Sequence, residues 1–408
     1  MTENSFDGGC VLQRCFDAAL RAVRPEAVLG ANVFVDERGI GFVRGTQRAF
    51  VTHPDRARGG RLRLLAFGKA AARFAHAFLA AAPGTVDEGL VVVKEGHAEP
   101  VPNCWILEAA HPVPDLRSVA AGEAVLAFAG RSRAVDRHVV LLSGGASSLV
   151  VAPIEGCTLA DKIALTQAAL RSGASIAALN AERKKLSRLK GGKLAALLGD
   201  SASLVLAISD VEGDDPGVIA SGPMSPSAGV AETVSYALVA TPDDALTAFA
   251  AQAQREDCRV TSLGRSMYGD LDDCIASFET ALSRLPDSSD VPQMLLAAGE
   301  PTVRLRGVGR GGRCQEFALR LARTLQGRAG VTVLAAGTDG TDGPTDATGA
   351  IVDGTSWPRM VQEGVDPLRR LADNDSHRAL AAADALLRTG PTGTNVADLY
   401  AALVYRLR

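Results

Sequence analysis

The sequence predicts an α/β protein in which a mostly parallel sheet carries helices on both faces. Short apolar runs at residues 62–67, 89–93, 138–142 and 204–208 alternate with segments of helical periodicity. Such alternation requires crossover connections, which place consecutive strands parallel to one another. The chain is 47% apolar and only 4% aromatic, with 42 glycines, a composition that suits helices packed closely on buried strands.

The first half of the chain supplies most of this pattern. Strands are predicted at 62–67, 89–93, 105–110, 138–142 and 204–208, and helices at 11–23, 70–82, 117–128, 158–171 and 183–198. The opening helix is expected to stop at Pro25, because proline breaks helices. The segment from there to Gly60 has no clear pattern, so no element is predicted in it.

A second α/β block follows residues 221–226, which are rich in breakers and predict a linker. Strands are predicted near 260 and at 294–298 and 331–336, and helices at 243–253, 270–285, 316–325 and 377–387. A last helix is predicted to begin near Val396, because Asn395 is placed to cap it.

The bulk composition excludes several classes of protein. A net charge of -3 and a pI of about 6.1 give no global attraction to nucleic acid or to anionic lipid. Neither a signal peptide nor a membrane-spanning run is recognisable. The seven cysteines are scattered, with no CxxC pair, which is typical of a reducing compartment. We therefore expect a cytoplasmic enzyme.

The stretch at 331–353 is the strongest candidate for a ligand site. An apolar run with the length of a buried strand breaks there into a loop of glycine, threonine and aspartate. In open α/β sheets, ligands lie beyond the carboxyl ends of strands. The carboxylates of Asp339, Asp342 and Asp346 suit substrate hydroxyls or a hard cation such as Mg2+. An ordinary Asp-Gly turn is the alternative interpretation.

A second candidate is the turn Ser143-Gly144-Gly145-Ala146-Ser147-Ser148, which follows a predicted strand. Glycines followed by hydroxyls present backbone N–H groups that can cradle an anion. An ordinary strand-end turn is the alternative, and a serine nucleophile is disfavoured because no GxSxG occurs. Lys69 also follows a strand-ending glycine, which favours a ligand contact over a surface charge.

Basic and acidic loops add further candidates. Residues 183–193 carry six basic side chains, and Lys190 precedes two glycines where the helix is expected to break. A solvated helical face is the alternative, and RNA binding is disfavoured because no aromatic residues interleave with the charges. The loop at 307–312 matches GxGxxG, but the arginines Arg310 and Arg313 favour terminal or transferring phosphates. Asp210 belongs to a second possible cation or hydroxyl site.

Taken together, these segments resemble the glycerate 2-kinase family, which joins a glycerate-kinase N-terminal domain to a C-terminal MOFRL domain. The resemblance covers nearly the whole chain, with the motifs in the family's order. They are GKA at 68–70, HPVPD at 111–115, LLSGGASSL at 141–149, LSRLKGGKLA at 186–195, ISDVEGDDPGVIASGP at 208–223, GGRCQEFAL at 311–319, GTDGTDGPTDATGA at 337–350 and TGPTGTNVADL at 389–399.

The resemblance implies a Rossmann-like three-layer α/β/α large domain at 1–232 and a smaller α/β domain at 233–408, with the active site in the cleft between them. The last helix, at about 395–408, is expected to pack back on the first domain. The implied reaction is the phosphorylation of D-glycerate to 2-phosphoglycerate, with ATP and Mg2+ as cofactors. A monomer or a homodimer is expected, with no nucleic-acid or membrane partner.

The family pattern places catalytic candidates at Lys69 and Arg313, which would neutralise the charge that develops in phosphoryl transfer. ATP is expected to contact Ser143, Gly144, Gly145, Ser147, Ser148, Lys190, Gly191, Gly192, Gly311, Gly312, Thr338 and Asp339. The substrate is expected to contact Lys69, Asp210, Arg313, Glu316 and Asn395. Asp339 and Asp210 are the candidate ligands of Mg2+.

Three positions depart from the family pattern. The family often has histidine where Lys185 stands, proline where Glu212 stands and asparagine where Cys314 stands. The last position adjoins Arg313, so local hydrogen bonding and substrate preference are open. Two other functions also stay open. A hydroxypyruvate reductase would hold NADH or NADPH on the 307–312 loop, and a non-enzymatic sensor would bind the nucleotide without turnover.

Overall fold

The computed structural model describes residues 7–171, 176–225, 232–286 and 290–406, with side chains described for all of these except 166–180. They form two compact units. The first unit contains Arg24–Ala240 and the short segment Gly393–Asn395. The second contains helix α1 (Gly8–Val23), Thr241–Thr392 and the chain from Val396 onward. The predicted division at residues 232 and 233 differs from this one, because α1 belongs with the second unit and strand β9 with the first.

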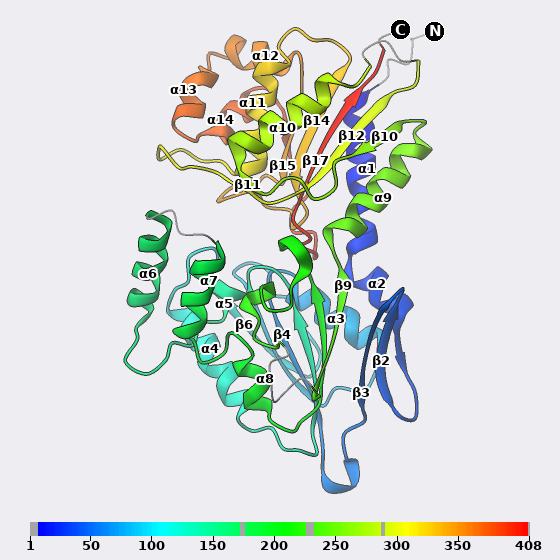
Figure 1. The fold of residues 1–408 in the computed structure, drawn as a ribbon, viewed down its shortest axis with the longest axis vertical. Helices are drawn as coiled ribbons and strands as arrows, with labels where there is room; N and C mark the ends of the chain where they lie inside the picture. The colour runs from blue at the N-terminus through cyan, green and yellow to red at the C-terminus, as the bar shows by residue number, and fades with distance from the viewer. Residues whose placement is uncertain (1–6, 172–175, 226–231, 287–289, 407–408) are drawn as a thin grey trace. The chain divides into compact units, whose positions relative to one another are not determined.

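The first unit is built on a six-stranded sheet with the order β6-β5-β4-β7-β8-β9. Strands β4, β6 and β9 of this sheet are labelled in Figure 1. Every neighbouring pair in it is parallel. The strands are β4 (Leu62–Phe67), β5 (Glu88–Lys94), β6 (Cys104–Ala109), β7 (Arg137–Leu142), β8 (Ser203–Ile208) and β9 (Val234–Ala240). Within this sheet, the first strand in the sequence is β4, and the next two, β5 and β6, lie on one side of it. The following strands, β7, β8 and β9, lie on the other side. The strand order therefore reverses between β4 and β7, as in dinucleotide-binding folds.

Both faces of this sheet are covered. Helices α4 and α8 bury their side chains in one core cluster with Leu65 and Phe67 of β4. Leu64 and Ala66 point to the opposite face and are also fully buried, as expected for a strand in a three-layer fold. The helical elements of this unit are α2 (Pro25–Asn32), η1 (Arg56–Arg58), α3 (Ala71–Ala81), α4 (Leu116–Ala129), α5 (Ala146–Leu149), α6 (Leu159–Arg171), α7 (Ile176–Lys185), α8 (Lys193–Leu198), η2 (Glu212–Asp214) and η3 (Ile219–Ser221).

Two segments of the first unit add detail to the sequence prediction. The unassigned segment before Gly60 forms helix α2 and an antiparallel sheet of β1 (Val33–Val35), β2 (Gly39–Arg44) and β3 (Gln47–Thr52). Pro25 begins a helix here, a position that tolerates its missing N–H. The helical segment predicted at 183–198 is interrupted, as expected from the two glycines after Lys190: α7 ends at Lys185 and α8 begins at Lys193. Gly191 and Gly192 adopt φ values of 66° and 81°, which end the helical path.

The second unit is built on a mixed sheet with the order β10-β12-β17-β14-β15-β16. Only β10 and β12 pair in parallel, and the other pairs are antiparallel. The strands are β10 (Arg259–Ser262), β12 (Gln293–Gly299), β14 (Val331–Gly337), β15 (Gly349–Asp353), β16 (Leu386–Leu387) and β17 (Asp398–Val404), with a separate pair of β11 (Gly269–Asp270) and β13 (Pro301–Thr302).

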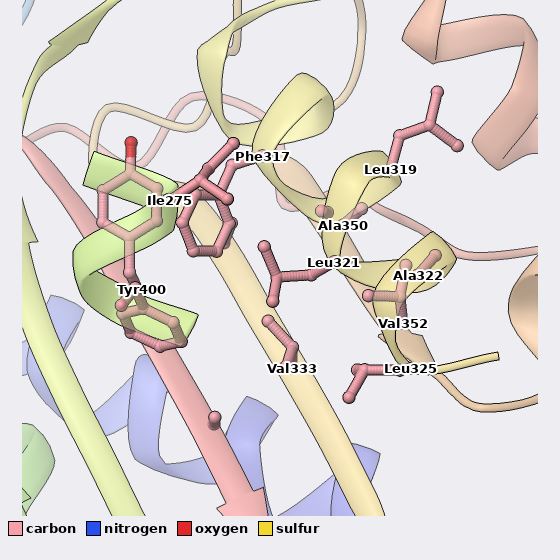
Figure 2. Close-up of a cluster of buried hydrophobic side chains, with 14 of the residues drawn as sticks. Ile275, Phe317, Leu319, Leu321, Ala322, Leu325, Val333, Ala350, Val352 and Tyr400 are labelled. Carbon is pink, nitrogen blue, oxygen red and sulfur yellow. The ribbon is translucent and has the colours of Figure 1, made fainter. Parts of the chain in front are cut away.

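Helix α11 packs across this sheet in the core shown in Figure 2. Phe317 of α11 meets Tyr400 of β17 edge to face, with ring centroids 4.7 Å apart. The helices of the unit are α1, α9 (Pro242–Arg255), α10 (Leu271–Ser283), α11 (Arg313–Thr324), α12 (Ser356–Gln362), α13 (Pro367–Ala372) and α14 (Ser376–Ala382). In the described part of the chain, no helix combines the length and the apolar character needed to span a membrane.

The last helix, predicted at about 395–408, is wrong. Asp398–Val404 is strand β17, which pairs with β12 on one side and β14 on the other and is buried throughout. Leucine and alanine favour helices, but burial on both faces decides the structure here. Asn395 therefore caps no helix. The helix predicted at 377–387 is also too long, since α14 stops at Ala382 and Leu386–Leu387 forms β16.

Candidate functional site

Two loops meet at the point where the strand order of the first unit reverses. Lys69, after β4, donates its backbone N–H to the carbonyl oxygen of Gly144, after β7, at 2.9 Å. The hydroxyl of the buried Ser143 accepts the backbone N–H of Ala70 at 3.2 Å. A Cβ on Gly68 would lie 2.1 Å from that hydroxyl oxygen, so only glycine allows this approach. The sequence indicates both loops as candidates for ligand binding, and the structure places them in contact.

Gly145 forms a small cradle next to Lys69. Its φ is 84°, and helix α5 begins at the following residue. The position that a Cβ would occupy on Gly145 lies 3.0 Å from Cγ of Lys69 and 3.0 Å from Cδ2 of His111. The glycine thus leaves space between a cationic side chain and an imidazole. A cationic side chain and an imidazole beside a glycine turn are groups that can bind a phosphate.

Asp210, Asn395 and Gly144 also come together in the first unit. Nδ2 of Asn395 donates to Oδ2 of Asp210 at 2.7 Å. A Cβ on Gly144 would lie 1.8 Å from that carboxylate oxygen and 1.9 Å from the amide nitrogen. The predicted substrate contacts Asp210 and Asn395 are therefore neighbours of the predicted phosphate turn.

Ser147 connects this turn to Lys190. The buried ammonium of Lys190 donates to the carbonyl oxygen of Ser147 at 3.2 Å. Burial, together with the positive charges of Lys162 and Arg183, lowers the pKa of Lys190 to about 7. Three other contacts fix the segment. The Ser147 and Ser221 hydroxyls are 2.6 Å apart, Gly191 donates its N–H to the Ser221 carbonyl at 3.1 Å, and Gly192 donates to that of Gly222 at 2.7 Å. Ser148 donates its N–H to the Gly145 carbonyl at 3.0 Å.

Arg313, the first residue of α11 in the second unit, is held by two carboxylates. Its Nε donates to Oδ2 of Asp398, and its Nη2 donates to Oδ1 of Asp398 at 3.1 Å and to Glu300 at 2.7 Å. Burial alone would lower the pKa of Arg313, but Asp398 and Glu300 outweigh it and raise the pKa well above its usual value. The guanidinium therefore stays charged and fixed in direction.

Asp339 lies at the same edge of the second sheet. Gly299 of β12 and Gly337 of β14 both pair with Asp398, so the ends of these strands meet the start of β17. A Cβ on Gly337 would lie 3.3 Å from a carboxylate oxygen of Asp339 and 3.3 Å from one of Asp398. Oδ1 of Asp339 also accepts the N–H of Thr341 at 2.9 Å. The hydroxyl of Thr338 joins the end of β14 to the segment before β17. It donates to the carbonyl oxygen of Ala397 and accepts the backbone N–H of Val396.

Asp342 binds the backbone of the first turn of α11. Its carboxylate accepts the backbone N–H groups of Cys314 at 3.2 Å and Gln315 at 2.8 Å. Burial, followed by the charge of Asp398, raises the pKa of Asp342 to about 6. Glycine is required at Gly312, since a Cβ there would lie 2.2 Å from this carboxylate. A Cβ on Gly311 would lie 2.1 Å from the hydroxyl oxygen of Ser376, so this position is confined as well.

Glu316 lies one turn further along α11 and has protein partners for both carboxylate oxygens. Arg320 donates to Oε1 at 2.7 Å and Asn374 donates to Oε2 at 2.9 Å. Oδ1 of Asn374 in turn accepts the N–H groups of Arg306 and Gly307. The N–H groups of Val308 and Gly309 go to Asp373, at 3.1 Å and 2.9 Å. In a dinucleotide loop these N–H groups would face a pyrophosphate, so the geometry does not favour that use of the GxGxxG match.

The structure therefore sorts the predicted residues into two groups. Lys69, Ser143, Gly144, Gly145, Ser147, Ser148, Lys190, Gly191, Gly192, Asp210 and Asn395 belong to the first unit, and Gly311, Gly312, Arg313, Glu316, Thr338 and Asp339 to the second. Sequence reasoning missed Asp398 and Glu300 as partners of Arg313. Asp398 would have been found if 398–404 had been assigned as a strand, because its first residue would then lie beside the end of β14.

The donor chemistry is compatible with a hard cation, although the described residues contain no preformed cluster. No group of three or more histidine, cysteine, aspartate or glutamate side chains among them has the geometry of a metal site. Mg2+ commonly takes only one or two carboxylates and completes its shell with water and phosphate oxygens. Asp210 in the first unit and Asp339 in the second each carry a carboxylate, and their role as ligands of Mg2+ stays a prediction.

Comparison with known proteins gives consistent matches over the whole chain. Residues 11–246 match a domain of unknown function (DUF4147), and residues 293–398 match the MOFRL family. A protein named D-glycerate 2-kinase from Thermotoga maritima is 38% identical over 386 residues, covering 84% of this chain and 91% of its own length. One named putative hydroxypyruvate reductase from Agrobacterium vitis is 38% identical over 444 residues, covering 99% and 96%. The crystal structure of a glycerate kinase from Thermotoga maritima superposes with a TM-score of 0.77 at 33% identity, covering 97% of this chain and 99% of that one.

Proposed function

This chain belongs to the glycerate 2-kinase family, and on that premise we propose that it transfers a phosphoryl group from ATP to the 2-hydroxyl of D-glycerate. The products are 2-phosphoglycerate and ADP. One observation carries the proposal beyond the family: the contact of the Lys69 and Gly144 loops where the strand order reverses. Ligands of doubly wound sheets bind at such a point.

Lys69 and Arg313 are the proposed catalytic residues. Phosphoryl transfer needs its developing negative charge neutralised and its oxygens aligned more than it needs covalent help. Lys69 brings a flexible cation next to Gly145, where its ammonium would neutralise the charge of phosphate oxygens. Arg313 brings a guanidinium whose direction Asp398 fixes through two hydrogen bonds. Asp398 is thus a positioning residue.

The other predicted contacts take supporting roles in this proposal. The turn at 143–148 and the segment Lys190-Gly191-Gly192 are proposed to hold the anionic ends of the ligands, the turn through backbone N–H groups and the segment through the ammonium of Lys190. The N–H groups of Gly191 and Gly192 are donated to the carbonyls of Ser221 and Gly222, so these glycines would shape the segment rather than bind the anion. Asn395 holds the Asp210 carboxylate in place, which would let Asp210 accept a substrate hydroxyl. ATP is the proposed phosphoryl donor, and Mg2+, when bound, would neutralise its phosphate charge. Asp339 and Asp210 are the proposed carboxylates for that ion.

We further propose that the enzyme works in the cytoplasm as a monomer or a homodimer. All seven cysteines are free thiols, which suits a reducing compartment where ATP is available. The alternative function, reduction of hydroxypyruvate with NADH or NADPH, has less support. The N–H groups of Gly307, Val308 and Gly309 are already bound to Asn374 and Asp373.

A pair of assays on the purified protein tests the proposed function. The first follows ADP release with ATP, Mg2+ and D-glycerate, and the second follows NADH oxidation with hydroxypyruvate. We expect ADP release that depends on D-glycerate and no oxidation of NADH. Oxidation of NADH without ADP release would mean that the 307–312 loop binds a dinucleotide and would refute the kinase. ATP binding without either reaction would favour the nucleotide sensor.

A further inference from the structure

A buried polar cluster lies beside Arg313 in the second unit. Arg313 and Cys314 are the first two residues of α11, and Asp398 and Tyr400 are the first and third residues of β17. Residues two apart on a strand project from the same face of the sheet. Both strand residues accordingly contact α11, since Asp398 pairs with Arg313 and the ring of Tyr400 packs against Phe317.

The phenol of Tyr400 is fully buried, and its hydroxyl has a charged partner. The hydroxyl donates to Oδ2 of Asp398 at 3.2 Å, and Sγ of Cys314 lies 3.9 Å from the hydroxyl oxygen. Burial is the largest cause that raises the pKa of Tyr400 and the pKa of Cys314 well above their usual values. Both groups therefore keep their protons, and the Tyr400 hydroxyl stays a hydrogen-bond donor.

Asp398 benefits from such a donor because negative charge gathers around it. Its side chain is 4% exposed, and its charge helps to raise the pKa of the buried Asp342, so the two carboxylates repel each other. Glu300 is a third carboxylate, bound to the Arg313 guanidinium at 2.7 Å. One guanidinium thus interacts with three carboxylates. A hydrogen bond from a neutral phenol stabilises Asp398 without adding further charge.

The hydroxyl also restricts the direction of the Arg313–Asp398 pair. Nε of Arg313 donates to the same carboxylate oxygen as Tyr400, and Nη2 of Arg313 donates to the other oxygen. These two bonds fix the guanidinium relative to the carboxylate, but the carboxylate could still rotate about its own side-chain bonds. The hydroxyl opposes that rotation because its ring is held in the core, edge to face with Phe317 (Figure 2).

We propose that Tyr400 is a positioning residue for phosphoryl transfer, whose hydroxyl holds Asp398 in the orientation that directs Arg313. Because Tyr400 is fully buried, it acts on the substrates only through Asp398 and Arg313. Cys314 contributes by contacting the hydroxyl from the first turn of α11. The inference rests on the proposed function for the catalytic role of Arg313, whereas the hydrogen bonds that carry it are independent of the substrate.

Tyr400→Phe tests the assignment, because it removes the hydroxyl and keeps the ring. We expect kcat with ATP and D-glycerate to fall about fivefold, since a misdirected guanidinium stabilises the transition state less well. A merely structural hydroxyl would lower the melting temperature and leave kcat unchanged at a temperature where the variant is folded. That result would overturn the assignment.

Tyr405→Phe is the matched control. Tyr405 directly follows β17, at the opposite end of the strand from Asp398, and its hydroxyl lies 3.4 Å from that of Thr332. The control removes the same atom from the same segment of chain, so kcat should stay unchanged. An equal fall of kcat in Tyr405→Phe and Tyr400→Phe would mean that the contact with Asp398 has no special role.

A double variant tests whether Tyr400 acts through Asp398. In Asp398→Asn the charged partner of Arg313 is already lost, so adding Tyr400→Phe should change kcat by less than about twofold. Residues that act independently would instead give effects that add. A fivefold loss in both backgrounds would therefore contradict the inference.

Proton–nitrogen NMR of Arg313 provides a measurement that does not depend on turnover. The signal of its Nε–H, assigned with Arg313→Lys, should exchange with solvent about tenfold faster in Tyr400→Phe and at the wild-type rate in Tyr405→Phe. If Tyr400→Phe shows no cooperative thermal transition, Cys314→Ala takes its place. Cys314→Ala keeps the hydroxyl and removes the thiol beside it, so we expect a smaller increase in exchange. An unchanged rate in the folded variants would overturn the assignment.

The outcomes separate this inference from the proposed function. A wild type without ADP release that depends on D-glycerate would refute the function, and faster exchange in Tyr400→Phe would still establish that Tyr400 positions Arg313. In an active kinase, normal kcat together with normal exchange in Tyr400→Phe would keep the function and overturn the role of Tyr400.

Discussion

The charged loops of the two units are held in place by different means. In the first unit, Lys69 lies in a backbone framework of glycines whose missing Cβ atoms allow loops to touch. In the second unit, Arg313 is held by side-chain ion pairs with Asp398 and Glu300. The difference implies different weaknesses, since a glycine framework fails when an atom is added and an ion-pair framework fails when a charge is removed.

The largest effect is expected from adding a methyl group to the first framework. In Gly144→Ala the new Cβ would collide with Asp210 and Asn395, at 1.8 and 1.9 Å, and would displace the turn that contacts Lys69. A displacement of this size in a catalytic site lowers kcat by about a hundredfold. Steady-state kinetics with D-glycerate, combined with circular dichroism, measures the change.

Gly30→Ala is the matched control for that variant. Gly30 lies in helix α2 with no atom within 4 Å of its Cβ position, so alanine should leave turnover unchanged and stabilise the helix slightly. Equal turnover in the two variants would show that the Gly144 contact is irrelevant to catalysis.

Removing a charge from the second framework should have the next largest effect. In Asp398→Asn, Arg313 loses one of its two carboxylate partners, and we expect kcat to fall about tenfold because the guanidinium is no longer fixed in direction. The free energy of unfolding should fall by about 2 kcal/mol, less than for a fully buried pair, because the Arg313 side chain is partly exposed and Glu300 remains. Kinetics and urea denaturation measure the two effects.

Asp290→Asn provides the control in the same unit. Asp290 is exposed and pairs with Arg406, which is also exposed, so its charge should contribute little to stability and nothing to turnover. If Asp398→Asn changes kcat and the free energy of unfolding no more than Asp290→Asn does, Asp398 does not position Arg313 for catalysis.

The pH dependence of the free energy of unfolding sharpens the comparison. Ionisation of the buried Asp342 in the second unit destabilises the folded protein. Its pKa of about 6 in the folded protein is above the ordinary 3.8, so its contribution to stability is full below pH 4 and is lost as the pH rises through 6. Relative to Asp342→Asn, the wild type should lose about 2 kcal/mol between pH 4 and pH 7. Urea midpoints of the two proteins at both pH values measure this. A constant difference would mean that Asp342 titrates normally.

The smallest effect concerns a departure from the family pattern. Lys185 is exposed and pairs only with Glu182 in the described structure, so Lys185→His should change stability by less than about 0.5 kcal/mol and leave kcat unchanged. A clear change in kcat would place this side chain at the site and would require the basic segment to be interpreted again.

The parallel sheet could be predicted because its strands are short apolar runs separated by long helices, a pattern that local sequence determines. Leu62–Phe67 is an example in which the predicted and observed bounds agree. Asp398–Val404 failed because its leucine and alanine content favours a helix, whereas its conformation is set by burial between β12 and β14. That contact joins residues distant in sequence, so no local pattern reports it.

The same limit applies to the candidate site. The glycine turns near Lys69 could be predicted because their chemistry is concentrated in short motifs. The partners of Arg313 could not, since Glu300 follows β12 and Asp398 begins β17, and only the sheet brings them together. The predicted roles of Lys69 and Arg313 remain predictions until their variants are measured.

Phosphorus NMR of the reaction product tests the central claim most directly. The protein is incubated with ATP, Mg2+ and D-glycerate, and the phosphoglycerate formed is identified by its coupling to the carbon-bound protons. We predict 2-phosphoglycerate, in which the phosphate couples to the single proton on C2. Formation of 3-phosphoglycerate, with coupling to two protons on C3, would contradict the account, because the secondary hydroxyl would then not be the acceptor.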